Sequence, residues 1–370
     1  MSVVFSTLAF IFLICVLVTI HELGHLIVAR ANGVFAEIFS IGFGPVLCEK
    51  TDKYGTKWRL SLIPAGGYVK MFGDADATSV KESMPSGYTE DDMNKMSLHR
   101  KKPWQKLLVA VAGPVFNLVF AVVVLVCLGL IRGVPVHTSA ISVVDEASLA
   151  YISGLRNGDI VVKANGADIS DFDVLREQIT LSAGKELILE VKRRDKTENI
   201  TIKMYKEEDN KIVPVNVIGI MPGETLYKKT SLINTITSSV YTTYFLAVNN
   251  ISAILKIITN KASTKNVGGI ISIFKIASKS AEAGFTSFFW MMAVLSTILG
   301  AINLLPIPVL DGGTVVISAI EWIFGRPLNK KLIETIFMIG FVIIAGLMLL
   351  GIWNDLSNCK FFVWLENLFK

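Results

Sequence analysis

The chain has 370 residues, of which 52% are hydrophobic and 18% are charged, and its mean hydropathy is +0.55. This apolar content is high for a soluble globular protein and indicates a membrane protein. A net charge of only +5, with no basic patch, argues against a nucleic-acid partner. The four cysteines lie far apart along the chain, so neither a disulfide framework nor a cysteine metal site is indicated.

Four runs contain no Lys, Arg, Asp or Glu and are long enough to cross a bilayer as helices. They extend over residues 1–20, 107–131, 283–310 and 335–354. The first lacks a signal-peptide cleavage site, so we expect it to be a retained span. Basic residues precede the second and fourth runs, and the positive-inside rule therefore predicts that residues 31–106 and 311–334 face the cytoplasm.

The strongest motif is His21-Glu22-Leu23-Gly24-His25, which directly follows the first apolar run. On a helix, residues four apart share one face, so the two imidazoles can bind one Zn²⁺. Glu22 lies beside them and can act as general base toward a water whose pKa zinc lowers. The alternative is that the histidines only cap a membrane helix at the headgroups.

Residues 35–71 alternate between apolar and polar positions, as in the segment WRLSLI, and are interrupted by Gly66 and Gly67. This pattern predicts a β-hairpin sheet on the cytoplasmic side, whose role is either purely structural or in strand pairing with a substrate. His99 and His137 fall in loops, where we expect solvated surface residues rather than metal ligands.

Residues 134–206 have a soluble character, with strand-like segments, the turn GLRNGD and a helical stretch near residues 173–181. The order of these segments resembles a PDZ domain of the kind found in bacterial proteases. Such domains bind extended peptide ends by strand addition. The alternative is a small α+β spacer without a ligand.

A fifth uncharged run covers residues 230–255, but 12 of its 26 residues are Ser, Thr or Asn. Because polar side chains are costly in lipid, we interpret this run as a helix on the membrane surface. The alternative, a fifth span, would move Asp311 to the opposite side of the membrane from His25.

A catalytic zinc site usually has three protein ligands, and Asp311 is the best candidate for the third. It directly follows the third apolar run, at the end of the sequence Asn303-Leu-Leu-Pro-Ile-Pro-Val-Leu-Asp311. The two prolines cannot extend a regular helix. Gly312 and Gly313 permit a tight turn that would direct the carboxylate at a metal.

The combination of HELGH with NLLPIPVLDGG resembles the site-2 protease family of intramembrane zinc metalloproteases, in its bacterial branch with a PDZ domain between the second and third spans. The resemblance covers nearly the whole chain and includes the segments GFGP at 42–45, PAGGYVKM at 64–71 and GPVFN at 113–117. Thr314 departs from the His of many relatives, and NVGGI at 266–270 replaces a segment rich in Gly and Pro.

The resemblance implies that His21, His25 and Asp311 are the Zn²⁺ ligands, that Glu22 is the general base and that Asn303 contacts the substrate backbone. It also implies that a membrane-associated β-loop handles substrate, and the corresponding residues here are Gly66, Gly67 and Tyr68.

We therefore expect a mainly α-helical, multi-pass protein with four transmembrane helices, a cytoplasmic-side β-hairpin sheet and an inserted PDZ-like α+β domain. Its predicted parts are residues 1–133 with the first two spans, 134–206 with the PDZ-like domain, 207–282 as a juxtamembrane amphipathic region and 283–370 with the last two spans. The expected location is the bacterial inner membrane, with the site near the cytoplasmic side and the PDZ-like domain outside.

The expected function is intramembrane cleavage of transmembrane segments after an earlier cut outside the membrane. The resemblance suggests single-span regulators of sigma factors or remnant signal peptides as substrates, with the PDZ-like domain binding a peptide C-terminus or extended segment and the lipid bilayer surrounding the spans. Two alternatives are open: a membrane-anchored zinc protease acting on exposed peptides, and a non-catalytic PDZ-bearing membrane adaptor.

Overall fold

The computed structural model describes residues 3–74, 83–84, 87–136, 139–143, 146–194, 196–208, 211–215, 217–223, 226–259 and 268–357. The chain divides into two compact units. The first contains Met1–Leu128 and Ile236–Lys370, and the second contains Gly129–Thr235.

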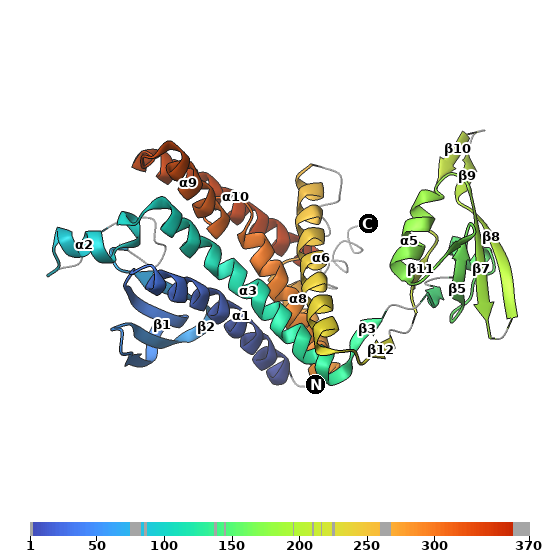
Figure 1. The fold of residues 1–370 in the computed structure, drawn as a ribbon, viewed down its shortest axis with the longest axis horizontal. Coiled ribbons are helices and arrows are strands. Elements are labelled where there is room, and N and C mark those ends of the chain that lie inside the picture. Colours follow the sequence, from blue (N-terminus) through green and yellow to red (C-terminus); the bar gives the residue numbers. More distant parts are fainter. Residues whose placement is uncertain are drawn as a thin grey trace, which may run out of the picture. The chain divides into compact units, whose positions relative to one another are not determined.

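Within the described residues, four helices are long and apolar enough to cross a membrane (Figure 1). They are α1 (Val3–Ala31), α3 (Pro103–Arg132), α8 (Phe285–Asn303) and α10 (Lys330–Ser357). The prediction of four candidate membrane helices is thus confirmed. Large apolar side chains of α10 are strongly exposed, with Met338 and Leu349 both at 68%, as expected for a surface that meets lipid rather than water.

The third apolar run forms a shorter helix than its length suggested. Helix α8 ends at Asn303, because Pro306 and Pro308 cannot continue the helical hydrogen-bond pattern. Conversely, α1 continues through the HELGH motif to Ala31. A further helix, α9 (Asp311–Phe324), follows the prolines and was not predicted.

The predicted hairpin is present as β1 (Ala36–Thr51) paired antiparallel with β2 (Lys57–Met71). Residues 38–41 of β1 pair with residues 57–60 and also with 67–70 of β2, so they have a neighbour on both edges. Both strands therefore bend in the middle, and positive φ values at Gly42 and Gly66 mark the bends. The side of the membrane on which the hairpin lies remains a prediction.

The hairpin packs against the C-terminal half of α1. Phe39 and Val69 of the sheet share a buried cluster with Leu26 of the helix. At the hairpin turn, Asp52 accepts hydrogen bonds from Arg30 and from the Trp58 indole. Burial raises the pKa of Asp52, but these bonds and two from backbone N–H groups outweigh burial and lower the pKa to about 2. The carboxylate is therefore ionised near neutral pH and holds the turn at the end of α1.

The remaining described helices of the first unit are shorter or less apolar. They are α2 (Glu90–Met96), the 3₁₀ turn η1 (Leu98–Arg100), α6 (Leu232–Ile258), which starts in the second unit, and α7 (Ile270–Glu282). Asp355 of α10 accepts hydrogen bonds from the backbone N–H groups of Ile271 and Ser272, so α10 caps the N-terminus of α7.

Helix α6 confirms a helix in the fifth uncharged run. It has 27 residues, so it is long enough to cross a membrane, but it is not apolar enough to be one of the four candidate spans. Ser239 and Thr243 are buried, whereas Tyr241 and Tyr244 are 67% and 65% exposed. One stripe of hydroxyl side chains on α6 thus faces protein, while large side chains, including Ile233 at 72%, are uncovered, the reverse of the pattern on a surface helix of a soluble protein. Its placement on the membrane surface remains a prediction.

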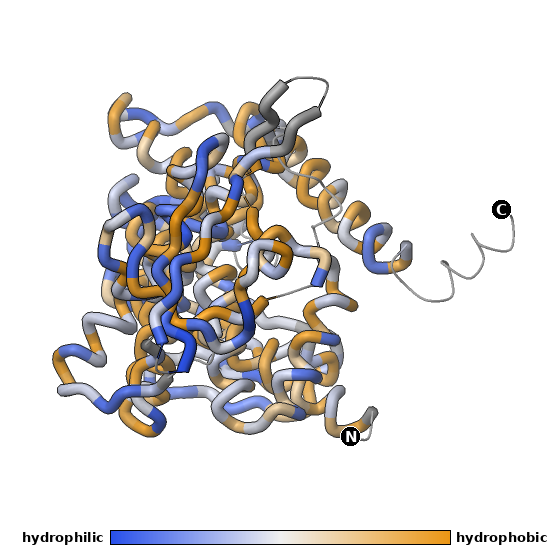
Figure 2. Tube along the Cα trace, turned by 90° about the vertical axis from the view of Figure 1, so that its right-hand side faces the viewer, coloured by the Kyte–Doolittle hydropathy of each residue, from blue (hydrophilic) through white to orange (hydrophobic). Residues whose placement is uncertain are grey.

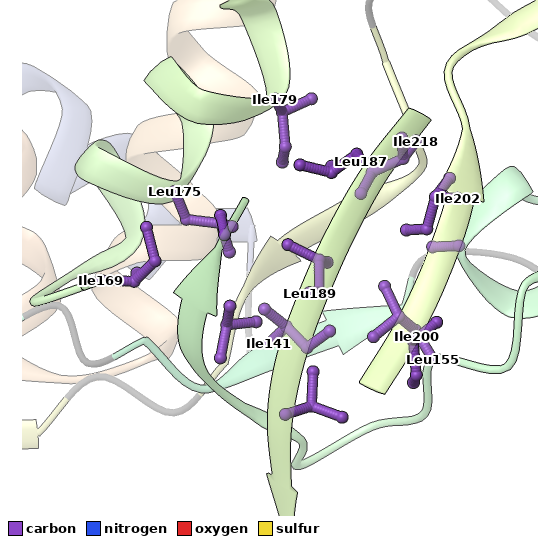
Figure 3. Close-up of a cluster of buried hydrophobic side chains, with 14 of the residues drawn as sticks. Ile141, Leu155, Ile169, Leu175, Ile179, Leu187, Leu189, Ile200, Ile202 and Ile218 are labelled. Atoms are coloured by element: carbon purple, nitrogen blue, oxygen red, sulfur yellow. The ribbon is translucent and has the colours of Figure 1, made fainter. Parts of the chain in front are cut away.

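The second unit is built on a four-stranded antiparallel sheet of order β6-β5-β7-β8. Figure 2 shows hydrophobic and hydrophilic residues alternating along strands of this unit, which face the viewer. Side chains of α5, such as Leu175 and Ile179, point toward Leu187 and Leu189 on β7, and these four residues are buried in one hydrophobic cluster (Figure 3). Because successive side chains of a strand point to opposite faces of the sheet, Leu187 and Leu189 of β7 lie on the same face, which α5 covers.

Strands that close the second unit come from beyond the predicted limits of 134–206. β11 pairs with β4 and β12 with β3, so the unit continues past residue 206, into the region assigned to a juxtamembrane segment. The elements are β3 (Val134–Val136), β4 (Ile141–Val143), α4 (Leu149–Ile152), β5 (Ile160–Ala164), β6 (Ala167–Asp168), α5 (Phe172–Leu181), β7 (Glu186–Arg193), β8 (Lys196–Lys203), β9 (Tyr205–Glu208), β10 (Lys211–Pro214), β11 (Ile220–Pro222) and β12 (Leu226–Lys228).

Candidate active site

Three potential metal ligands converge from two helices. His21 and His25 lie one turn apart on α1, and their Nε2 atoms are 3.2 Å apart. Asp311, the first residue of α9, places Oδ2 at 3.0 Å from His21 Nε2 and Oδ1 at 3.4 Å from His25 Nε2. One ligand atom from each residue lies within 4.8 Å of the others. Two imidazoles and one carboxylate are a donor set typical of catalytic zinc.

The segment between α8 and α9 brings Asp311 to the histidines. Gly312 and Gly313 lie in the first turn of α9, not in the tight turn that we expected. A Cβ at Gly312 would be 2.1 Å from the Leu305 carbonyl oxygen, and one at Gly313 would be 2.7 Å from that of Ile307. The glycines therefore let α9 start directly against the preceding chain. Val309 just before it has a φ of +83°, a strained conformation for a β-branched residue.

Helix α3 supports both imidazoles. The His25 Nδ1 lies 2.8 Å from the Val109 carbonyl oxygen, which can only accept, so Nδ1 carries the proton and Nε2 keeps its lone pair for a metal. One turn along α3, a Cβ at Gly113 would lie 2.3 Å from His25 Nε2. After another turn, Asn117 lies beside His21 Nδ1. One face of α3 thus makes room for the rings and orients them.

The ligands line a cavity of about 480 Å³ together with Glu22, Tyr68 and Asn303. Val69 of β2 lines the same cavity, so the general-base candidate lies beside the hairpin. The structure thus brings the predicted ligands, Glu22 and Asn303 to one cavity, and Tyr68 reaches it from the hairpin.

Gly66 and Gly67 are not among the residues that line this cavity. A Cβ at Gly67 would lie 2.5 Å from the Ser40 carbonyl oxygen, and one at Gly66 would lie 2.7 Å from the Phe43 ring. Both glycines allow neighbouring parts of the hairpin to approach each other closely. They therefore affect the cavity only indirectly, by setting the course of β2 toward it.

His99 differs from its expected role as a solvated surface residue. Its Nε2 is 2.9 Å from Oδ1 of Asp74, which is 2% exposed, and its ring lines the cavity. The expectation was wrong because His99 contacts a residue 25 positions away in the sequence, and no local pattern indicates such a contact. Thr314 also lines the cavity. His137 and residues 266–267 lie outside the described part of the chain.

Sequence reasoning missed the supporting residues of α3. Gly113 and Asn117 belong to the segment GPVFN, but no role was assigned to either. Val109 acts through its backbone carbonyl, so the identity of its side chain gave no signal at all. The spacing of four residues between these positions is the one sequence feature that could have indicated a common helix face.

Comparison with known proteins agrees with this geometry. The chain matches the model of peptidase family M50 over residues 9–347. A protein of Agrobacterium fabrum that is named as a zinc metalloprotease is 33% identical to this chain. The match covers 94% of this chain and 95% of the Agrobacterium protein. The metalloprotease MmpA of Caulobacter vibrioides is 31% identical over 97% of both chains. A Campylobacter jejuni protein, also with a zinc metalloprotease name, is 34% identical over 95% of this chain and 93% of its own. The chain therefore belongs to peptidase family M50, the site-2 proteases, and is a membrane zinc metalloprotease.

Proposed function

We propose that this protein cleaves the transmembrane segments of single-span membrane proteins, with zinc held by His21, His25 and Asp311. The proposal is carried by the convergence of these three ligands at one end of a helix that is long and apolar enough to span a bilayer. Ionisable side chains at such a depth are costly unless they are paired or ligated, which favours a functional site.

Glu22 is the proposed general base. When bound, zinc supplies Lewis acidity, which makes water more acidic and polarises a peptide carbonyl. Glu22 takes a proton from the attacking water and delivers it to the leaving nitrogen, from a cavity that it shares with the ligands. Asn303 lies at the end of α8 on the same cavity, where its side-chain amide can donate a hydrogen bond to a substrate carbonyl.

The hairpin is the proposed substrate-pairing element. A helical substrate hides its peptide bonds in internal hydrogen bonds and must unwind before cleavage, so new backbone partners are needed. Residues 67–71 of β2 pair with β1 on one side, and Tyr68, Val69 and Met71 line the cavity. An unwound substrate segment can add as a strand along this edge.

The second unit is the proposed PDZ-like module, outside the cytoplasm, that admits substrates with trimmed external parts. Support comes from its antiparallel sheet covered by α5, and from the charge distribution that predicts residues 31–106 and 311–334 inside. The proposed substrates are membrane regulators of sigma factors or remnant signal peptides in a bacterial inner membrane.

Replacing Glu22 tests the mechanism. We expect Glu22→Gln to lower the cleavage of a model single-span substrate in liposomes by about 10²–10⁴-fold, because the proton acceptor is lost while the zinc ligands remain. Glu90→Gln is the matched control, since Glu90 is exposed on α2. Undiminished cleavage by the Glu22 variant would refute the mechanism.

Mass spectrometry of the products separates the proposal from its main alternative. Cuts within the apolar segment of the substrate support cleavage inside the membrane. Cuts confined to exposed loops would instead identify a membrane-anchored protease that acts on accessible peptides.

A further inference from the structure

We infer that Asn117 is a positioning residue that fixes the tautomer of His21 through its side-chain amide, and thereby controls the affinity of the site for zinc. The inference rests on the proposed ligand set and adds to it a residue that touches neither substrate nor metal.

The geometry around Asn117 is unusual for a buried amide. Its side chain is fully buried, and Nδ2 lies 3.2 Å from His21 Nδ1. Its Oδ1 is one of two buried side-chain polar atoms, within the described residues, that lack a hydrogen-bond partner. An unpaired buried carbonyl oxygen is destabilising, so a purely structural amide would be expected to satisfy both of its ends.

The chemistry of the ring explains what Asn117 does. A neutral imidazole has one N–H and one lone pair. The His21 Nε2 faces Asp311 and His25, and a ligand nitrogen must present its lone pair there. The proton then lies on Nδ1, which needs an acceptor. The Asn117 oxygen becomes that acceptor after a half-turn of the amide, which exchanges O and N within the same volume.

The two orientations of the amide correspond to two tautomers. With Nδ2 toward the ring, Nδ1 accepts and Nε2 carries the proton that it donates to Asp311. With Oδ1 toward the ring, Nδ1 donates and Nε2 is free to bind a metal. Only the second orientation stabilises the metal-binding tautomer of His21, as the Val109 carbonyl does for His25.

The backbone of Asn117 cannot easily move away from the ring. Ser296 of α8 donates a hydrogen bond of 2.8 Å to the Asn117 carbonyl oxygen, and Ser296 is fully buried. A Cβ at Gly300 would lie 2.8 Å from the Pro114 carbonyl oxygen, so α8 and α3 are in close contact beside this turn. The amide can turn, but its position relative to His21 is fixed.

Zinc affinity of the full-length chain in detergent tests the inference, measured by competition with a chelator. We expect Asn117→Leu, which keeps the volume but has no acceptor, to weaken zinc binding about 10–100-fold. Asn117→Asp restores an acceptor and should bind zinc close to wild type. Thr297→Val is the matched control, because Thr297 is fully buried on α8 and its hydroxyl bonds only within its own helix in the described contacts.

The outcomes separate this inference from the ligand assignment. A folded Asn117→Leu variant with wild-type zinc affinity overturns the inference if His21→Ala loses zinc. Retention of zinc by His21→Ala overturns the ligand set itself. If Asn117→Leu does not fold, NMR of the zinc-loaded wild type decides: a slowly exchanging, hydrogen-bonded Nδ1–H on His21 supports the role of Asn117, and an Nδ1–H that exchanges freely with water overturns it.

Discussion

Glycines at three positions of the site make room for its functional groups. Gly113 leaves space for both imidazoles, while Gly312 and Gly313 let the helix that carries Asp311 begin directly against the preceding chain. In each case the hydrogen in place of a side chain is what permits the approach. The neighbouring strain at Val309 adds to this crowding, because a β-branched residue there adopts a positive φ.

Gly113→Ala should therefore weaken zinc binding while leaving the fold intact. Its methyl group would meet His25 Nε2 at 2.3 Å and His21 Cε1 at 2.8 Å, and the rings must turn away from Asp311. We expect a loss of affinity of about 10-fold or more, comparable to the loss of an orienting partner, in a chelator competition.

The matched control for this substitution is Gly346→Ala on α10, where a Cβ meets nothing within 4 Å. Alanine favours a helix over glycine by up to about 1 kcal/mol, so this variant should keep zinc and melt no earlier than wild type. Equal zinc affinity in the two variants would contradict the proposed role of Gly113.

At the scale of elements, α3 positions all three ligands. Its backbone and side chains contact both histidines, and its first turn anchors α9 through Lys106, whose Nζ lies 3.3 Å from Oε2 of Glu321. The Glu321 side chain is 5% exposed and also accepts a hydrogen bond from the Leu328 N–H. Asp311 and Glu321 share α9, so this pair fixes the helix that delivers the third ligand.

Breaking the buried pair should destabilise α9. Lys106→Met leaves the Glu321 carboxylate buried without its cation, which typically costs about 3–5 kcal/mol. The double variant Lys106→Met with Glu321→Leu removes both charges and should recover most of that stability. Thermal unfolding in detergent measures both, with Lys95→Met as control because the Lys95–Asp91 pair is exposed. Equal melting of Lys106→Met and Lys95→Met would contradict this anchor.

At the scale of the whole molecule, the position of α6 decides which face of the membrane carries Asp311. If α6 lies on the membrane surface, both of its ends are on the same side of the bilayer as the second unit. If it crosses, its ends lie on opposite sides, and the third and fourth spans are inverted relative to the first two.

Single cysteines at Lys228, just before α6, and at Lys256, in its last turn, distinguish these arrangements. In a background without the native cysteines, we expect Lys228→Cys and Lys256→Cys to react with an impermeant thiol reagent from the same side of sealed vesicles. Labelling of the two positions from opposite sides would establish a fifth span and would place Asp311 across the membrane from His25, which the observed ion-pair distances do not allow.

The second unit should fold by itself, because it has its own sheet and buried core. We expect residues 133–230 to unfold in one cooperative denaturant transition monitored by circular dichroism. Leu189→Ala, at a fully buried position of β7, should lower the free energy of unfolding by about 2–5 kcal/mol. Ile188→Ala on the same strand is the control, since Ile188 is 47% exposed. Equal losses in both variants would contradict this core.

Features with a local signature could be predicted from the sequence alone. The four apolar runs, the hairpin and the helical spacing of His21 and His25 each depend on neighbours a few residues apart, whose periodicity is visible in the chain. The zinc chemistry followed from the same short motif. Asp311 was found as a candidate because prolines and glycines mark a broken helix end.

Only the tertiary structure decided which distant residues meet. The contacts of Val109 and Asn117 with the histidines, of His99 with Asp74, and of Lys106 with Glu321 join segments that have no shared sequence pattern. The closing strands of the second unit pair across most of its length for the same reason. The local sequence determines which secondary structure a segment forms. Contacts between distant segments arise instead from packing and from the need of buried polar groups for hydrogen-bond partners.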